Sequence, residues 1–168
     1  MFASMSKRYH IDRLEDYDWA RLKSLRLRSV IDAPEAFGSS LESMKIRPDE
    51  FWSSQVKQMA CLVAYSLAQD GKRDVGLVRG VMDPQMSNQI WLLGMWVDPA
   101  ARGHGLGERL THEIFKWGRS LNTVSTVKLE VVDNNTHAIA LYERLGFTLT
   151  GRSQAQVHTT DIEYEYLF

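Results

Sequence analysis

The chain has 168 residues, 44% of them hydrophobic and 24% charged, a size and composition that suit one compact domain with one hydrophobic core. Twenty basic against 21 acidic side chains give a formal net charge of −1, so charge does not favour nonspecific binding to nucleic acid or to an anionic membrane. Residues 1–7 lack the apolar core of a signal peptide, and no apolar run approaches membrane-spanning length. We therefore expect a single cytoplasmic domain over residues 1–168, with no nucleic-acid or membrane partner.

Cys61 is the only cysteine, so no internal disulfide can form, which fits a reducing compartment. It lies in an apolar run, residues 60–64, and this setting predicts a buried structural thiol rather than a nucleophile. No cluster of His, Cys and carboxylate side chains has the spacing of metal ligands, so we expect no metal site.

Hydrophobic periodicity predicts alternating strands and helices in the first half of the chain. In order, we expect a strand at 9–14, a helix at 16–30, a loop with a short turn at 31–43, a helix at 48–59, and strands at 61–68, 75–82 and 89–97. The last of these strands is apolar on both faces, which is typical of a strand covered on both sides. Gly94 interrupts it and predicts a bulge or a close backbone approach.

The second half begins with a glycine-rich turn, and a long amphipathic helix at 106–121 follows it. We then expect a strand at 126–132, a helix at 136–145 ended by Gly146, and a strand starting at 147. Residues 161–168 alternate apolar and acidic side chains, which predicts a final strand with one wet face. Strand–helix–strand connections around the turn indicate a mixed α/β fold with a locally parallel centre.

The turn itself has the features of an anion site. At the start of a helix the backbone N–H groups are unpaired, and the helix dipole favours negative charge there. Glycines at positions 103, 105 and 107 let a ligand approach the main chain, and Arg102 can add a charged fork for phosphate oxygens. These residues predict a phosphate or pyrophosphate ligand.

Two familiar nucleotide motifs do not fit this turn. The dinucleotide fingerprint needs G-x-G-x-x-G, whereas the glycines here are spaced two apart. The Walker loop needs Lys followed by Ser or Thr after its last glycine, but Glu108 and Arg109 stand there. A tight turn whose glycines only relieve strain is the remaining alternative to ligand binding.

Two blocks of sequence resemble the GNAT superfamily of acyl-CoA-dependent N-acyltransferases. In the first, residues 95–107, the end of a strand and a short loop lead into Arg-Gly-x-Gly-x-Gly. The second block, residues 135–147, contains Asn135, Ala138, Leu141, Tyr142, Leu145, Gly146 and Phe147 in the family's order. The resemblance implies a mixed sheet of about seven strands with a splayed central parallel pair, and about four helices.

The resemblance also implies how acetyl-CoA, the acetyl donor, would be held. Backbone groups near Met95 and Val97 would bond the pantetheine amides, and the turn would hold the pyrophosphate through Arg102, Gly103, His104, Gly105, Leu106 and Gly107. Asn135 would contact the cofactor from across the gap, although its residue type and position fit a helix N-cap at least as well.

Two residues are candidates for catalysis. The family places a tyrosine at the position of Tyr142 as the general acid that protonates the leaving thiolate; the alternative is a core tyrosine on an amphipathic helix. Many family members carry a glutamate on the central strand, but residues 90–97 contain no carboxylate or histidine. Glu130 on the next strand is the substitute base, and a solvated surface residue is the equally weighted alternative. His104 should contribute its backbone rather than acid–base chemistry.

The implied function is transfer of an acetyl group from acetyl-CoA to a primary amine of a small molecule or peptide, directly within a ternary complex. The alternative is a noncatalytic acyl-CoA-binding or sensing domain, which the missing carboxylate on the central strand would explain. A homodimer is compatible with either function. We expect the acceptor to meet the final strand pair and residues 31–42, where Asp32, Glu35 and Glu42 could attract a cationic amine.

Overall fold

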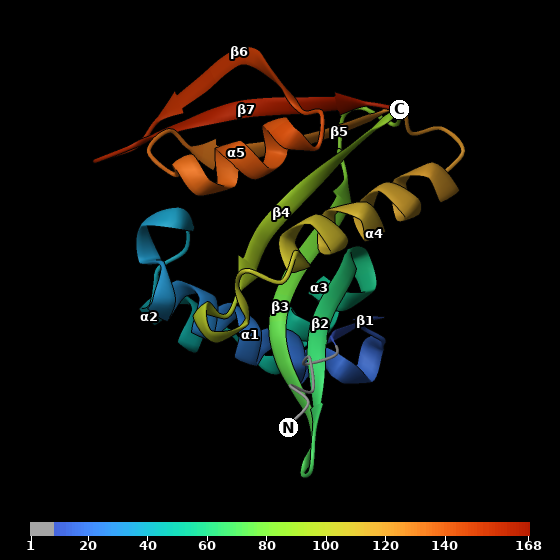
Figure 1. Ribbon diagram of the computed structural model, residues 1–168, viewed down its shortest axis with the longest axis vertical. Helices are drawn as coiled ribbons and strands as arrows, with labels where there is room; N and C mark the ends of the chain where they lie inside the picture. Colours follow the sequence, from blue (N-terminus) through green and yellow to red (C-terminus); the bar gives the residue numbers. More distant parts are fainter. Residues whose placement is uncertain (1–8) are drawn as a thin grey trace, which may run out of the picture.

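The computed structural model describes residues 9–168 and contains one seven-stranded sheet with the strand order β1-β2-β3-β4-β5-β7-β6 (Figure 1). The strands are β1 (Tyr9–Arg13), β2 (Ala60–Ala68), β3 (Gly71–Met82), β4 (Gln89–Val97), β5 (Thr126–Val132), β6 (Thr148–Ala155) and β7 (Thr160–Leu167). Only the central pair, β4 and β5, is parallel. The predicted mixed α/β fold is therefore confirmed.

Within residues 9–168, five α-helices accompany the sheet: α1 (Trp19–Asp32), α2 (Leu41–Lys45), α3 (Asp49–Gln58), α4 (Leu106–Ser120) and α5 (Thr136–Arg144). The prediction of a loop over 31–43 is wrong in part, because α1 runs on to Asp32 and α2 begins at Leu41. Ser40 caps α2 by accepting a hydrogen bond from the Ser43 amide, 3.1 Å away. A helix of five residues is too short to show a hydrophobic period, so the sequence pattern could not reveal it.

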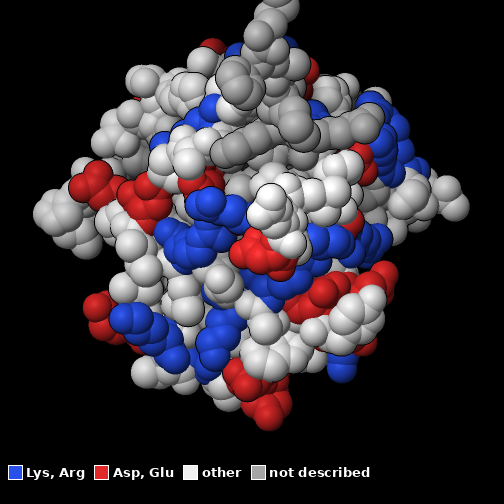
Figure 2. Space-filling view, turned by 60° about the horizontal axis from the view of Figure 1, so that its bottom comes forward, with Lys and Arg blue, Asp and Glu red and all other residues white. Residues whose placement is uncertain are grey.

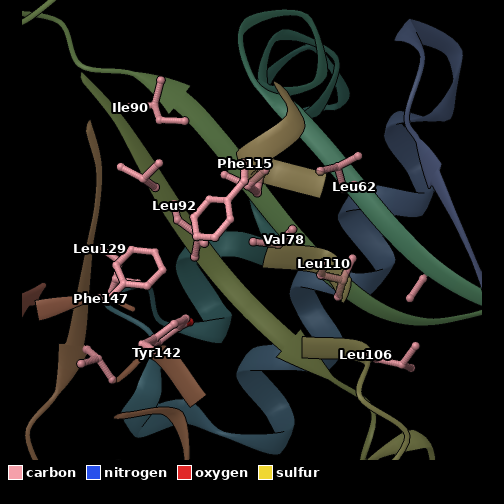
Figure 3. Packing of buried hydrophobic residues seen from close by; sticks show 14 of the residues in the cluster. Leu62, Val78, Ile90, Leu92, Leu106, Leu110, Phe115, Leu129, Tyr142 and Phe147 are labelled. Atoms are coloured by element: carbon pink, nitrogen blue, oxygen red, sulfur yellow. The ribbon is translucent and has the colours of Figure 1, made fainter. Parts of the chain in front are cut away.

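Two hydrophobic clusters fill the two sides of the sheet. Helices α1 and α3 cover one face, whereas α4 and α5 cover the other (Figure 1). Figure 3 shows the second cluster, in which α4 contributes Leu106, Leu110 and Phe115 and the C-terminal half contributes Leu129, Tyr142 and Phe147. The amphipathic stripe predicted for 106–121 is confirmed, since Leu106, Leu110 and Ile114 are at most 2% exposed.

The central strands separate soon after they pair. Residues 89–91 of β4 pair with residues 126–128 of β5, and no later pair joins the two strands. Figure 1 shows β4 diverging from β5 beyond this point. Gly94 adopts a φ of +59°, and the register between β3 and β4 shifts between Leu77 and Arg79, so the bulge expected at Gly94 is confirmed. The edge of β4 that faces β5 therefore carries backbone groups without a strand partner.

Strand β7 departs from the expected alternation. Glu163 was expected on a wet face, but it is only 6% exposed. Its carboxylate accepts a hydrogen bond from the Lys128 ammonium at 3.0 Å, and Lys128 also lies over the Trp91 ring at 5.9 Å. A charge can be buried when it is paired in this way. The partner comes from a different strand, so alternation along the chain could not predict the burial.

Acidic and basic side chains intermingle on the face of the molecule drawn in Figure 2. Ion pairs within residues 9–168 include Arg21 with Asp74 at 2.7 Å and Arg28 with Asp98 at 2.5 Å. Among the helices formed by residues 9–168, none has the length and apolar character needed to cross a membrane.

Candidate functional site

The splay of the two central strands opens a cleft of about 660 Å³. Its walls come from β4, the glycine-rich turn and the start of α4 on one side, and from β5 and α5 on the other. The segment after α1 also lines the cleft, through Ala33, Ala36 and Phe37. Residues far apart in the sequence thus meet around one cavity.

The glycine-rich turn lines this cleft. Gly103 and Gly105 have φ values of +79° and +70°, and Gly105 forms the N-cap of α4. The first intrahelical bond runs from the Arg109 amide to the Gly105 carbonyl, which leaves the amides of Leu106 and Gly107 without helical partners. Both residues line the cleft, so unpaired donors and the positive end of the helix dipole lie beside it.

Arg102 also lines the cleft, but its guanidinium is engaged within the protein. Its Nη2 donates to the Asp32 carboxylate at 2.7 Å, and its Nε donates to the Val97 carbonyl at 3.0 Å. The same Asp32 oxygen accepts a hydrogen bond from the Trp96 indole at 2.9 Å. The arginine is therefore held at the end of β4, with about half of its side chain exposed.

The side chain of His104 lies outside the cleft, against Tyr9. Its Nδ1 lies 3.2 Å from the Ala101 carbonyl oxygen and 3.0 Å from that of Arg102. The ring meets Tyr9 edge-on at 5.3 Å, and His104 is not among the residues that line the cleft. This placement leaves its ring no acid–base role in the cleft.

The other predicted cofactor contacts border the cleft. Met95 and Val97 line it from the free part of β4. Asn135 lines it from the start of α5, where its side chain also accepts a hydrogen bond from the Ala138 amide at 3.2 Å. The N-cap role expected for Asn135 is thus present, and it is compatible with a contact to a ligand.

Tyr142 projects from α5 into the floor of the cleft. The residue is 5% exposed, and its ring packs edge-on against Phe147. Figure 3 shows the hydroxyl end directed toward β4. No group within residues 9–168 forms a hydrogen bond with that hydroxyl. Burial raises the pKa of Tyr142 well above its ordinary value, so the hydroxyl keeps its proton at neutral pH.

Glu130 lines the cleft from β5, where its side chain is exposed. Partial burial raises the pKa of this carboxyl, and the charges of Asp161 and Glu163 on β7 raise it further. Glu130 lies opposite Glu163 in the sheet register. The side of the cleft formed by β5 and α5 therefore carries both a carboxyl of raised pKa and a protonated phenol.

Sequence reasoning missed several residues of the cleft, among them Glu108, His137 and Arg144. Arg144 sits at the last turn of α5, 3.9 Å from the Glu108 carboxylate, and adds a cation beside the start of α4. Of the carboxylates expected to meet the acceptor, Asp32 pairs with Arg102, and Glu35 lines only a smaller neighbouring pocket. Within residues 9–168, no three His, Cys, Asp or Glu side chains are grouped to hold a metal ion.

A profile of the acetyltransferase (GNAT) family matches residues 26–147. The chain belongs to this family. A mycothiol acetyltransferase of Geodermatophilus obscurus is 31% identical over 140 residues, which are 80% of this chain and 41% of that protein. A spermine/spermidine N(1)-acetyltransferase of Bacillus subtilis is 29% identical over 76 residues, or 45% of this chain and 50% of that protein. The chain thus spans only about two fifths to one half of the length of these relatives.

Solved structures show the same GNAT fold. A putative acetyltransferase from Acinetobacter baylyi superposes with a TM-score of 0.78 at 14% identity, covering 98% of this chain and 95% of that chain. A putative acetyltransferase from Salmonella typhimurium, solved with its cofactor acetyl-CoA, gives a TM-score of 0.76 at 16% identity, covering 95% and 94%. At these identities the likeness establishes the fold alone.

Proposed function

We propose that this protein is an N-acetyltransferase that moves the acetyl group of acetyl-CoA to a primary amine of a small molecule or peptide. The observation that carries the proposal is that the glycine-rich turn, Tyr142 and Glu130 all border one cleft. The residues named below are proposed to act within one domain formed by this chain, residues 1–168.

The cleft has the donors that a CoA diphosphate requires. The free amides at Leu106 and Gly107 are donors for phosphate oxygens. Gly103 and Gly105 have positive φ values, which favour glycine, so no side chain at these positions covers the turn. Arg102 uses Nε and Nη2 within the protein, and half of its side chain is exposed, so its remaining N–H donors are available to a phosphate. The free edge of β4 between Met95 and Val97 offers backbone groups to the pantetheine amides.

The acceptor amine must lose a proton, and the leaving sulfur must gain one. Acetyl-CoA, when bound, supplies the thioester, whose C–S bond breaks as the N–C bond to the amine forms. Glu130 takes the surplus proton from the amine, directly or through water, and its raised pKa makes it a stronger base than an ordinary glutamate. Tyr142 donates its proton to the thiolate; its raised pKa keeps that proton in place until then.

Direct transfer within a ternary complex is favoured by the state of the one cysteine. Cys61 is fully buried in the face of the sheet covered by α1 and α3, and burial raises its pKa to about 11. It is not among the residues that line the cleft. A covalent acetyl-cysteine route would need an exposed thiolate, which Cys61 does not provide.

The proposal is tested by mixing acetyl-CoA with a panel of amines, peptides and polyamines and measuring the release of free thiol. Amine-dependent release is expected, and Tyr142→Phe should lower kcat by roughly 10²- to 10⁴-fold, the usual contribution of a general acid, with little change in CoA affinity. Trp117→Phe, a packing change on α4, serves as the control and should retain turnover. Tight CoA binding with no thiol release across the panel would instead identify a noncatalytic CoA-binding domain.

A further inference from the structure

Arg26 is a buried cation without a counter-ion. It lies on the inward side of α1, between Leu22 and Val30, and only 6% of the residue is exposed. Its guanidinium forms no hydrogen bond or ion pair within residues 9–168, and its Nη1 is fully enclosed without a partner. Residues 1–8 contain no Asp or Glu, so they cannot supply a carboxylate side chain either.

A second guanidinium lies beside the first. Arg79 reaches the same region from β3, and its Nε is also enclosed without a partner. Its Nη1 donates only to neutral groups, the side-chain amide oxygen Oε1 of Gln55 at 3.0 Å and the Met59 sulfur at 4.0 Å. Burial and the charge of Arg79 lower the pKa of Arg26 to about 9, which leaves Arg26 positively charged at neutral pH. Two cations are thus held close together, and within residues 9–168 neither forms an ion pair with a carboxylate.

Both guanidiniums lie directly behind the wall of the cleft. A Cβ atom on Gly94, which lines the cleft, would be 3.0 Å from Arg79 Nη2 and 3.1 Å from Arg26 Nη1. Phe37, another lining residue, has its ring 5.3 Å from Arg26 Cζ. Arg26 Nε and Nη2 also lack partners, and they are not fully enclosed. Neither arginine is among the residues that line the cleft, so a ligand in the cleft would reach the guanidiniums only past Gly94 and Phe37.

Uncompensated buried charges are strongly unfavourable, and proteins normally pair them. The planar forks of two arginines match the oxygens of a carboxylate. We propose that Arg26 and Arg79 form a subsite for a carboxylate carried by the acceptor, so that the acceptor is an amino acid or another amine with a nearby carboxylate. This inference rests on the proposed acetyl transfer, because it describes the acceptor of that same cleft.

The subsite complements Glu130 across the cleft. Glu130 would face the amine, whereas the arginines behind Gly94 would take the carboxylate. The donor phosphates have a separate location at the turn after β4. The residues 31–42 expected to select the acceptor through acidic groups would then contribute Phe37, which covers Arg26.

The anion subsite can be tested without acetyl-CoA. Thermal unfolding is followed while acetate replaces chloride at constant ionic strength, for the unmodified protein, Arg26→Met and Arg28→Met. Arg28 is on the same helix but is paired with the Asp98 carboxylate and the Asp74 carbonyl, which makes it a matched control. Acetate should raise Tm in the unmodified protein and in Arg28→Met, and this rise should be absent in Arg26→Met.

The Tm values of the two variants in chloride, without acetate, give a second test, because the two substitutions should change Tm in opposite directions. Arg26→Met removes an unpaired buried charge and should raise Tm in chloride, whereas Arg28→Met breaks an ion pair and should lower it. If Arg26→Met instead lowers Tm and keeps the acetate response, Arg26 is a structural residue and the subsite does not exist. An equal response to acetate in all three proteins likewise overturns the proposal.

The substrate preference is then measured with matched pairs of an α-amino acid and its α-amide in the thiol-release assay. The carboxylate should be favoured by roughly 10- to 100-fold in kcat/KM, the value of charge-assisted hydrogen bonds, and Arg26→Met should reduce this ratio to near one. Turnover of amides and acids at equal rates would overturn the subsite and leave the acetyltransferase intact. Absence of any turnover would contradict the proposed function instead, while the acetate experiment would still decide the subsite.

Discussion

Replacement of Gly105 by valine separates a binding role of the turn from a merely structural one. Gly105 has a φ of +70°, a region that L-residues enter only at a cost of about 1–2 kcal/mol. Nothing lies within 4 Å of the position that its Cβ would take, so no steric term adds to this strain. For a chain of this size, the loss corresponds to a Tm lower by about 2–8 °C, which leaves the domain folded at 25 °C.

Gly151→Val is the matched control. Gly151 lies in β6 with a φ of +84° and also has nothing within 4 Å of its Cβ position, but it does not line the cleft. Both variants should lose similar Tm in calorimetric scans. In titration calorimetry with CoA, only Gly105→Val should weaken binding, by at least about tenfold, because its side chain prevents close approach to the backbone donors. Equal CoA affinity in the two variants would refute the assignment of the turn.

Two further outcomes are expected from the cited pKa shifts. The thiol of Cys61, whose pKa burial raises to about 11, should react slowly with a disulfide reagent at pH 8 in the native protein and rapidly once urea unfolds it; fast native labelling would contradict its burial. The pKa of Glu130 is raised in the fold, so its ionisation destabilises the folded state as pH rises through that pKa. The Tm gain from Glu130→Gln should therefore be greater at pH 8 than at pH 4, whereas Glu113→Gln, on the surface of α4, should not show a larger gain at the higher pH; a Glu130→Gln gain independent of pH would contradict the raised pKa.

Much of the fold could be predicted because its elements have strong local patterns. The apolar spacing along α4 is set by the helix itself, and the apolar run at 90–97 in β4 is typical of a strand covered on both faces. The five-residue helix α2 has no such period, and the burial of Glu163 depends on Lys128, 35 positions earlier in the chain. Contacts between distant residues of this kind leave no trace in local periodicity.

The same distinction applies to the site. The turn, Tyr142 and Asn135 could be found because they fall in motifs of fixed spacing. The pairing of Arg102 with Asp32 spans 70 positions, and no motif encodes it. Arg26 did leave a signal: it lies four residues from both Leu22 and Val30, on the apolar side of its helix. An arginine on a predicted apolar stripe indicates a buried cation, and its meaning required the structure to show that no carboxylate meets it.

A crystal structure of the protein with bound CoA would show directly whether the cleft holds the cofactor. Density for the ligand is expected in the cleft between β4 and β5, with the diphosphate on the amides of Leu106 and Gly107 and the sulfur beside the Tyr142 hydroxyl. CoA bound outside this cleft, or with its diphosphate away from the turn, would contradict the proposed cofactor site.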